Sequence, residues 1–105
     1  MTYKERLLAL AGLPDSEAVA TLISDLPKWA KYLKEQRNGL AHGDRERIGA
    51  DTTRMVFDTL EVTRALLGLV LLSQMGLSPE VQRRAAGLQY LNTIVSEFNK
   101  ALRVI

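Results

Sequence analysis

Hydrophobic residues recur along most of the chain at intervals of three and four positions, with polar residues between them. This spacing places apolar side chains on one face of an α-helix, and the strict alternation typical of a half-buried strand does not occur. Glycine, proline and short polar stretches divide the pattern into about five segments. The sequence therefore predicts an all-α fold, a single up-and-down bundle of about five helices.

Two short helices are predicted at the start of the chain. Thr2 and Glu5 have the spacing of a capping box, and the apolar pattern that follows them ends at Gly12. These signals predict a short first helix between the capping box and Gly12. A second apolar series with helical spacing predicts a second helix over residues 16–25.

The third predicted helix carries the most distinctive residues of the chain. Pro27 is tolerated in a first helical turn, and the apolar side of the helix includes Trp29 and Tyr32. We expect the helix to end near Gly43, because glycine adopts positive φ without a steric cost. The polar segment 43–50 is then predicted to be a loop.

Two longer helices complete the predicted bundle. Asp51 is expected to cap a fourth helix that closes at Gly76 and is apolar on nearly every side in its second half. Such a helix forms the centre of a bundle, part of a subunit interface, or both. Ser78 followed by Pro79 is a strong helix start, and a narrow apolar stripe predicts a fifth helix almost to the C-terminus.

Composition narrows the class of protein. The 105 residues, 47% of them hydrophobic, fit one globular domain over residues 1–105. The absence of cysteine excludes thiolate metal sites and cysteine nucleophiles, and it fits a reducing compartment, so we expect a cytoplasmic protein. The longest apolar run, residues 65–72, is far shorter than the roughly twenty residues that cross a membrane, so no membrane partner is expected.

His42 is the only histidine of the chain, so any acid–base step that uses imidazole must use it. A histidine just before a glycine at a helix end also serves simply to cap free carbonyls, and position alone does not separate the two roles. The stretch that leads to it begins with Arg37 and Asn38. Arginine remains charged and binds phosphate oxygens at two points, while imidazole accepts or donates a proton. Together these residue types are suited to chemistry on a phosphodiester.

The stretch Arg-Asn-Gly-Leu-Ala-His at residues 37–42 resembles the signature of the HEPN superfamily, an arginine usually followed by asparagine and then, a few residues later, a histidine. The order of helices is similar as well, and the resemblance looks closest to the C-terminal HEPN domain of ApeA-type anti-phage defence proteins. It implies a metal-independent endoribonuclease without a cofactor, acting in defence or stress response, with Arg37, Asn38 and His42 as catalytic residues. It also implies that the chain can be the C-terminal part of a longer protein.

Helix geometry adds a constraint on these three residues. Five residues of regular helix turn through about 500°, so Arg37 and His42 do not share a face, whereas Asn38 and His42 do. Asn38 can therefore orient the imidazole by a hydrogen bond. For Arg37 to join them, either the helix distorts near Gly39 or a second subunit supplies the partner. A two-fold homodimer would bring both copies of the pair into one cleft, and we expect such a dimer.

The region around the motif is basic. Residues 28–47 contain six basic and three acidic residues, a local charge of +3 in a chain whose formal charge is +2. We expect this region to attract RNA, with transfer RNA among the candidates, although solvated helix faces often have the same composition. The expected RNA-binding residues are Lys31, Lys34, Arg45 and Arg47. Trp29 and Tyr32 either stack on bases or belong to the core.

Other functions stay open at this stage. The acidic residues that flank His42 lack metal-ligand spacing, so no metal site is expected. One alternative is a non-catalytic RNA- or protein-binding helical dimerisation domain, and another is the toxin of a toxin–antitoxin pair. The corresponding partners are a regulatory domain or an antitoxin. Asp44 stands where HEPN toxins paired with a nucleotidyltransferase antitoxin usually have a tyrosine, which speaks against regulation through that residue.

Overall fold

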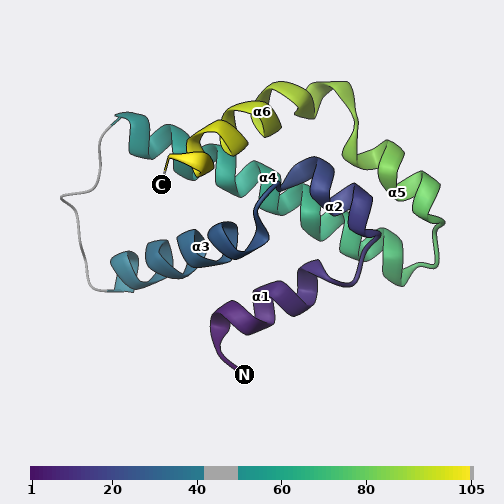
Figure 1. Ribbon diagram of the computed structural model, residues 1–105, viewed down its shortest axis with the longest axis horizontal. Coiled ribbons are helices and arrows are strands. Elements are labelled where there is room, and N and C mark those ends of the chain that lie inside the picture. Colours follow the sequence, from purple (N-terminus) through teal and green to yellow (C-terminus); the bar gives the residue numbers. More distant parts are fainter. Residues whose placement is uncertain (42–49, 105) are drawn as a thin grey trace.

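The computed structural model describes the backbone of residues 1–41 and 50–104, and the side chains of residues 1–38 and 53–104. These ranges contain six helices: α1 (Tyr3–Ala11), α2 (Ser16–Leu22), α3 (Leu26–Ala41), α4 (Ala50–Gln74), α5 (Pro79–Ala86) and α6 (Gln89–Arg103) (Figure 1). No strand occurs among the described residues, which confirms the all-α class.

Side chains at the helix starts explain where several helices begin. The Thr2 hydroxyl accepts the N–H of Glu5 at 3.1 Å, and the Glu5 carboxylate accepts the N–H of Thr2 at 3.1 Å. This is the capping box that the sequence predicts. Asp15 caps α2 by accepting the N–H of Ala18 at 3.1 Å, and Ser78 caps α5 in the same way.

The second helix is shorter than predicted. It ends at Leu22 rather than at residue 25, because Ile23 is extended, with φ −134° and ψ 110°. Asp25 then belongs to the start of α3, where its carboxylate accepts the N–H of Lys28 at 3.1 Å. The end of one helix and the start of the next therefore fall within a few residues, and the chain turns sharply between them.

The fourth helix begins earlier than predicted. It starts at Ala50, so Asp51 lies inside its first turn and is not the residue that precedes the helix. The other end agrees with the sequence, because Gly76 follows the helix with φ 80°, a conformation that favours glycine. The predicted end of the third helix at Gly43 and the remainder of the predicted loop, residues 43–49, lie outside the described residues.

The predicted fifth helix is in fact two helices, α5 and α6. Gly87 ends α5, and Leu88 is extended, with φ −58° and ψ 134°. The break lets α5 pack against α2 while α6 returns along α4 in the opposite direction (Figure 1). Of the predicted stripe, the α6 residues Leu91, Phe98 and Leu102 are buried in the core.

The inner side of α4 forms the centre of the core. The largest fully buried side chains, contributed by α4 and by the helices around it, are Leu22, Ile23, Trp29, Val62, Leu66, Leu69, Phe98 and Leu102. The outer side of α4 is apolar too, yet Phe57, Leu60, Leu67 and Leu71 are between 44% and 64% exposed. The prediction that this helix is apolar on nearly every side is thus confirmed, and the described residues cover its inner side and leave these four side chains exposed.

Polar contacts fix α5 against the start of α2. The guanidinium of Arg83 donates to the Asp15 carboxylate, with Nε 3.0 Å from Oδ2, and the Asp15 N–H donates to the Gln82 side chain at 2.7 Å. The hydrogen bond from Arg83 holds the pKa of Asp15 below its ordinary value. The carboxylate is therefore ionised at neutral pH, as both of its roles, cap and ion-pair partner, require.

A buried amide joins α2 to α6. The Oδ1 atom of Asn99 accepts the N–H and the hydroxyl of Ser24, both at 3.0 Å. Its Nδ2 atom donates to the carbonyls of Leu22 at 3.0 Å and of Val95 at 2.9 Å. Asn99 thus supplies partners for backbone groups at the end of α2, which have none within their own helix.

Replacing Asn99 with alanine should lower the free energy of unfolding by roughly 2–4 kcal/mol, because backbone groups at the end of α2 would lose their hydrogen-bond partners. Urea denaturation measures this change. Asn92→Ala, on the exposed side of the same helix, is the matched control and should change the free energy by less than about 0.5 kcal/mol. Equal losses for the two variants would contradict the role given to Asn99.

Candidate functional site

Two buried aromatic residues fix the position of α3, the helix that leads to the motif. The side chain of Trp29 is fully buried, and its Nε1 atom donates to the hydroxyl of Thr63 on α4 at 3.0 Å. Tyr32 is 7% exposed, and burial raises the pKa of its hydroxyl against the smaller, opposite effect of a hydrogen bond with Thr59. Both rings belong to the core, so the alternative in which they stack on bases is wrong.

The start of α3 is tied to the end of α6. The Nζ atom of Lys28 donates to the carbonyls of Leu102 and Arg103, both at 3.2 Å. The last carbonyls of a helix lack partners within it and carry the negative end of its dipole, so a cation there is stabilising. Lys28 contributes to the basic composition of this region, but its ammonium group serves the fold.

The outward side of α3 carries the remaining cations and the first motif residues. Lys31, Lys34, Arg37 and Asn38 are all exposed. Lys31, Lys34 and Arg37 follow one another at intervals of three, which places them in one row along the helix. The structure therefore brings these three cations together on one surface. Arg45 and Arg47, the other two expected RNA-binding residues, lie outside the described residues.

The guanidinium of Arg37 contacts the N-terminal helix. Its Cζ atom lies 4.5 Å from the centroid of the Tyr3 ring, in the first turn of α1. A guanidinium over the face of an aromatic ring is attracted by the negative charge density of that face. Sequence reasoning missed Tyr3, because no local pattern relates it to Arg37. The packing of α1 against α3 creates the contact.

The last described turns of α3 bear on one of the two ways of completing the motif. The helix continues through Gly39 to Ala41, so the distortion near Gly39 that would let Arg37 meet His42 within one subunit is not present in this part of α3. His42 itself lies outside the described residues.

Metal ligands do not gather among the side chains that the structure describes, since no three histidine, cysteine, aspartate or glutamate residues in those ranges are arranged to hold an ion. None of the described helices is both long enough and apolar enough to cross a membrane.

Replacing Tyr3 with leucine should lower the free energy of unfolding by roughly 0.5–1 kcal/mol through loss of the contact with Arg37, whereas phenylalanine keeps the ring face and should change it little. Denaturation of Tyr3→Leu, Arg37→Met and the double variant yields the coupling energy between the two side chains. Strict additivity of the two single changes would show that the contact contributes nothing.

The sequence profile of one protein family, described as Apea-like HEPN, matches residues 1–81. The matched part extends from α1 into α5 and contains the whole motif at residues 37–42. No curated protein and no solved structure shows a significant match to the chain. Because the profile covers well over half of the 105 residues, the chain belongs to the Apea-like HEPN family.

Proposed function

We propose that this chain is an endoribonuclease that cleaves RNA without a metal ion, with Arg37, Asn38 and His42 as its catalytic residues. The observation that carries the proposal is the Arg-Asn-Gly-Leu-Ala-His stretch, which starts on the exposed end of α3 in a chain of the Apea-like HEPN family. Membership of this family suggests a nuclease or defence-related role. We infer action in the cytoplasm, in anti-phage defence or stress response.

The reaction assigned to the site is attack of a ribose 2′-oxygen on the adjacent phosphorus. The bond from phosphorus to the 5′-oxygen breaks, which leaves a 2′,3′-cyclic phosphate and a 5′-hydroxyl. A base must take the proton of the 2′-hydroxyl, and an acid must protonate the departing 5′-oxygen. His42 is assigned proton transfer, because imidazole titrates near neutral pH. Arg37 is assigned the stabilisation of the negative charge that develops on the phosphate oxygens.

The contact with Tyr3 is compatible with this role of Arg37. The N–H groups of a guanidinium lie in its plane, so an aromatic ring against one face leaves the edges available to phosphate oxygens. The ring also restricts a long side chain at the exposed end of α3. Arg37 would then reach the substrate with less loss of side-chain entropy than a freely moving arginine.

We propose that the complete site is composite and forms on a two-fold axis between two subunits. A chain with one histidine provides an acid and a base together only if two copies meet. In a regular helix Arg37 and His42 do not share a face, and α3 is regular through Gly39, so we assign Arg37 to act with His42 of the other subunit. Asn38 is proposed to orient the imidazole.

The row of cations on α3 supports RNA as the substrate, with transfer RNA among the candidates. Lys31 and Lys34 extend from Arg37 along one exposed side of the helix, and a row of this kind attracts a phosphate backbone without reading its sequence. Arg45 and Arg47, which follow the motif, are proposed to continue this surface.

A second candidate is a non-catalytic RNA- or protein-binding domain that mediates dimerisation, held in a larger assembly by a regulatory domain. The exposed apolar side of α4 favours it, because such a surface requires a partner. A toxin neutralised by an antitoxin partner is a variant of the nuclease proposal and uses the same three residues.

Replacing His42 with alanine should reduce RNA cleavage by at least about 100-fold, because proton transfer to and from the reacting oxygens is lost. The measurement is the initial rate on labelled RNA with end-group analysis, which should find 2′,3′-cyclic phosphate and 5′-hydroxyl ends. Arg84→Ala removes an exposed cation of α5 and is expected to keep the wild-type rate. Wild-type cleavage by the His42 variant would reject the assignment, and binding without cleavage by the wild type would favour the second candidate.

Cleavage should also persist in an excess of EDTA at an unchanged initial rate, because the proposed acid, base and cation are all side chains. The comparison requires the same ionic strength with and without chelator, since binding of phosphate by cations depends on salt. Loss of activity that added Mg²⁺ restores would contradict the metal-independent mechanism.

A further inference from the structure

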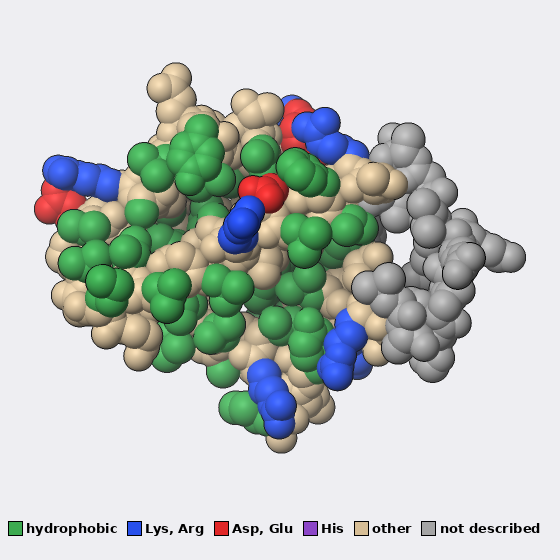
Figure 2. All heavy atoms as spheres, turned by 180° about the vertical axis from the view of Figure 1, so that it is seen from behind, with side chains coloured by type: hydrophobic (Ala, Val, Ile, Leu, Met, Phe, Trp, Pro, Cys, Tyr) green, Lys and Arg blue, Asp and Glu red, His purple; other side chains and the backbone are tan. Residues whose placement is uncertain are grey.

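The outer face of α4 carries a stripe that its own bundle leaves uncovered. Its residues alternate at intervals of three and four positions: Phe57, Leu60, Arg64, Leu67 and Leu71. The four apolar members are between 44% and 64% exposed. This spacing is that of a helix packed lengthwise against another helix. Figure 2, which views the molecule from the side opposite α2, shows hydrophobic side chains gathered across this face.

One ion pair interrupts the stripe near its middle. The Nη1 atom of Arg64 lies 3.5 Å from Oε1 of Glu61, and the side chains of the two residues are 80% and 29% exposed. In a two-fold contact each surface patch meets its own copy in the reverse order. The acid of one copy therefore meets the base of the other, and the base meets the acid. The charged part of the stripe is therefore complementary to itself.

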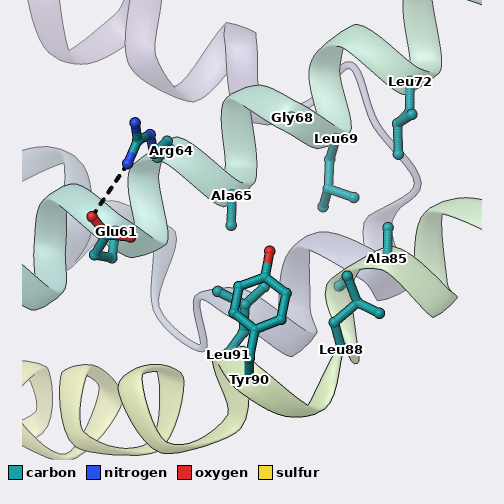
Figure 3. A pocket seen from close by; sticks show the side chains of 11 residues that line it. Glu61, Arg64, Ala65, Gly68, Leu69, Leu72, Ala85, Leu88, Tyr90 and Leu91 are labelled. Atoms are coloured by element: carbon teal, nitrogen blue, oxygen red, sulfur yellow. Dashed lines mark ion pairs between the residues drawn. The ribbon is translucent and has the colours of Figure 1, made fainter.

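A groove of about 470 Å³ runs beside the stripe, between α4 and the corner where α5 gives way to α6 (Figure 3). Ala65 and Gly68 line it on α4, and Leu88 and Tyr90 line the opposite wall. A Cβ atom at Gly68 would meet nothing within 4 Å, and Tyr90 is 74% exposed. The groove is therefore open to a side chain that comes from outside.

We propose that the outer face of α4 binds a second copy of this chain, with the two α4 helices antiparallel and each Arg64 paired with Glu61 of the other copy. In an antiparallel pair, a step toward the C-terminus on one helix corresponds to a step toward the N-terminus on the other. The register set by the charges therefore places Phe57 of one copy opposite Gly68 of the other. An aromatic side chain then meets a glycine at an open groove. The ion pairs and the sizes of these two side chains therefore favour the same register.

The same register places Leu60 of each copy opposite Ala65 of the other, so the apolar part of the contact continues on both sides of the charges. A helix rises 1.5 Å per residue, so the starts of the two α4 helices would lie roughly 40 Å apart. The end of α3 lies at the same end of the molecule as the start of α4 (Figure 1), so the ends of the two α3 helices are then at opposite ends of the pair. This contact does not build the composite nuclease site, so the two proposals concern different surfaces of the chain.

Charge reversal tests the contact. Glu61→Arg leaves two bases at the centre of the stripe in each copy, and Arg64→Glu leaves two acids. Like charges then face each other across the contact, so each variant alone should self-associate at least about tenfold more weakly than the wild type. An equimolar mixture of the two variants restores both pairs and should associate as the wild type does. Sedimentation equilibrium measures all four samples.

Controls separate this contact from folding and from catalysis. Arg84→Glu makes the same charge change at an exposed pair of α5 and should leave association unchanged. His42→Ala should also associate as the wild type does, whatever its effect on cleavage. Thermal denaturation confirms that the charge variants fold, as expected for changes in an ion pair on the outer face of α4. A wild-type chain that stays monomeric at millimolar concentration, or a mixture no heavier than its components, overturns the proposal.

The absence of cysteine permits a direct measurement of orientation. A spin label on Gln74→Cys, at the exposed end of α4, should report a distance of roughly 35 Å between copies in the antiparallel register. Gly68→Leu fills the groove and should weaken association without unfolding the chain. A label separation near 10 Å would indicate parallel helices and overturn the proposed register.

Discussion

The burial of Trp29 determines what the rest of α3 can present to solvent. Its indole is enclosed by the core and its one polar atom bonds to Thr63 on α4, so a rotation of α3 would expose a large ring and leave that N–H without a partner. Asn38 follows nine positions later, which is two full turns plus about 180°, so it lies on the opposite side of the helix from Trp29. The same constraint that buries the indole therefore directs Asn38 outward. Lys28 and Tyr3 secure the two ends of the helix in that orientation.

Features that depend on neighbours in the sequence were predictable, and features decided by distant residues were not. The capping box of Thr2 and Glu5 has both members within one turn, so it can be recognised without a fold. The break before α6 escaped recognition because Leu88 continues the apolar spacing across Gly87, and the pattern alone reads as one helix. The end of α2 was placed too late, since the backbone there is held by Asn99 from the far end of the chain.

The features of the candidate site also divide into those set by neighbours in the sequence and those set by distant residues. The motif at residues 37–42 is local, and the exposure of Arg37 and Asn38 agrees with a role at the surface. The sequence left two roles open for Trp29, and only its packing against α4 excluded base stacking. The contact between Arg37 and Tyr3 could not be predicted from the sequence, because it depends on the packing of α1 against α3.

The hydrogen bonds of Asn99 also bear on the order of events during protein synthesis. The groups that it joins, around residues 22–24 and 95–99, leave the ribosome far apart in time. The end of α2 therefore gains these hydrogen bonds only after the segment containing α6 has emerged. The motif that starts on α3 would thus reach its folded setting late in translation, after most of the messenger RNA for these residues has already been read.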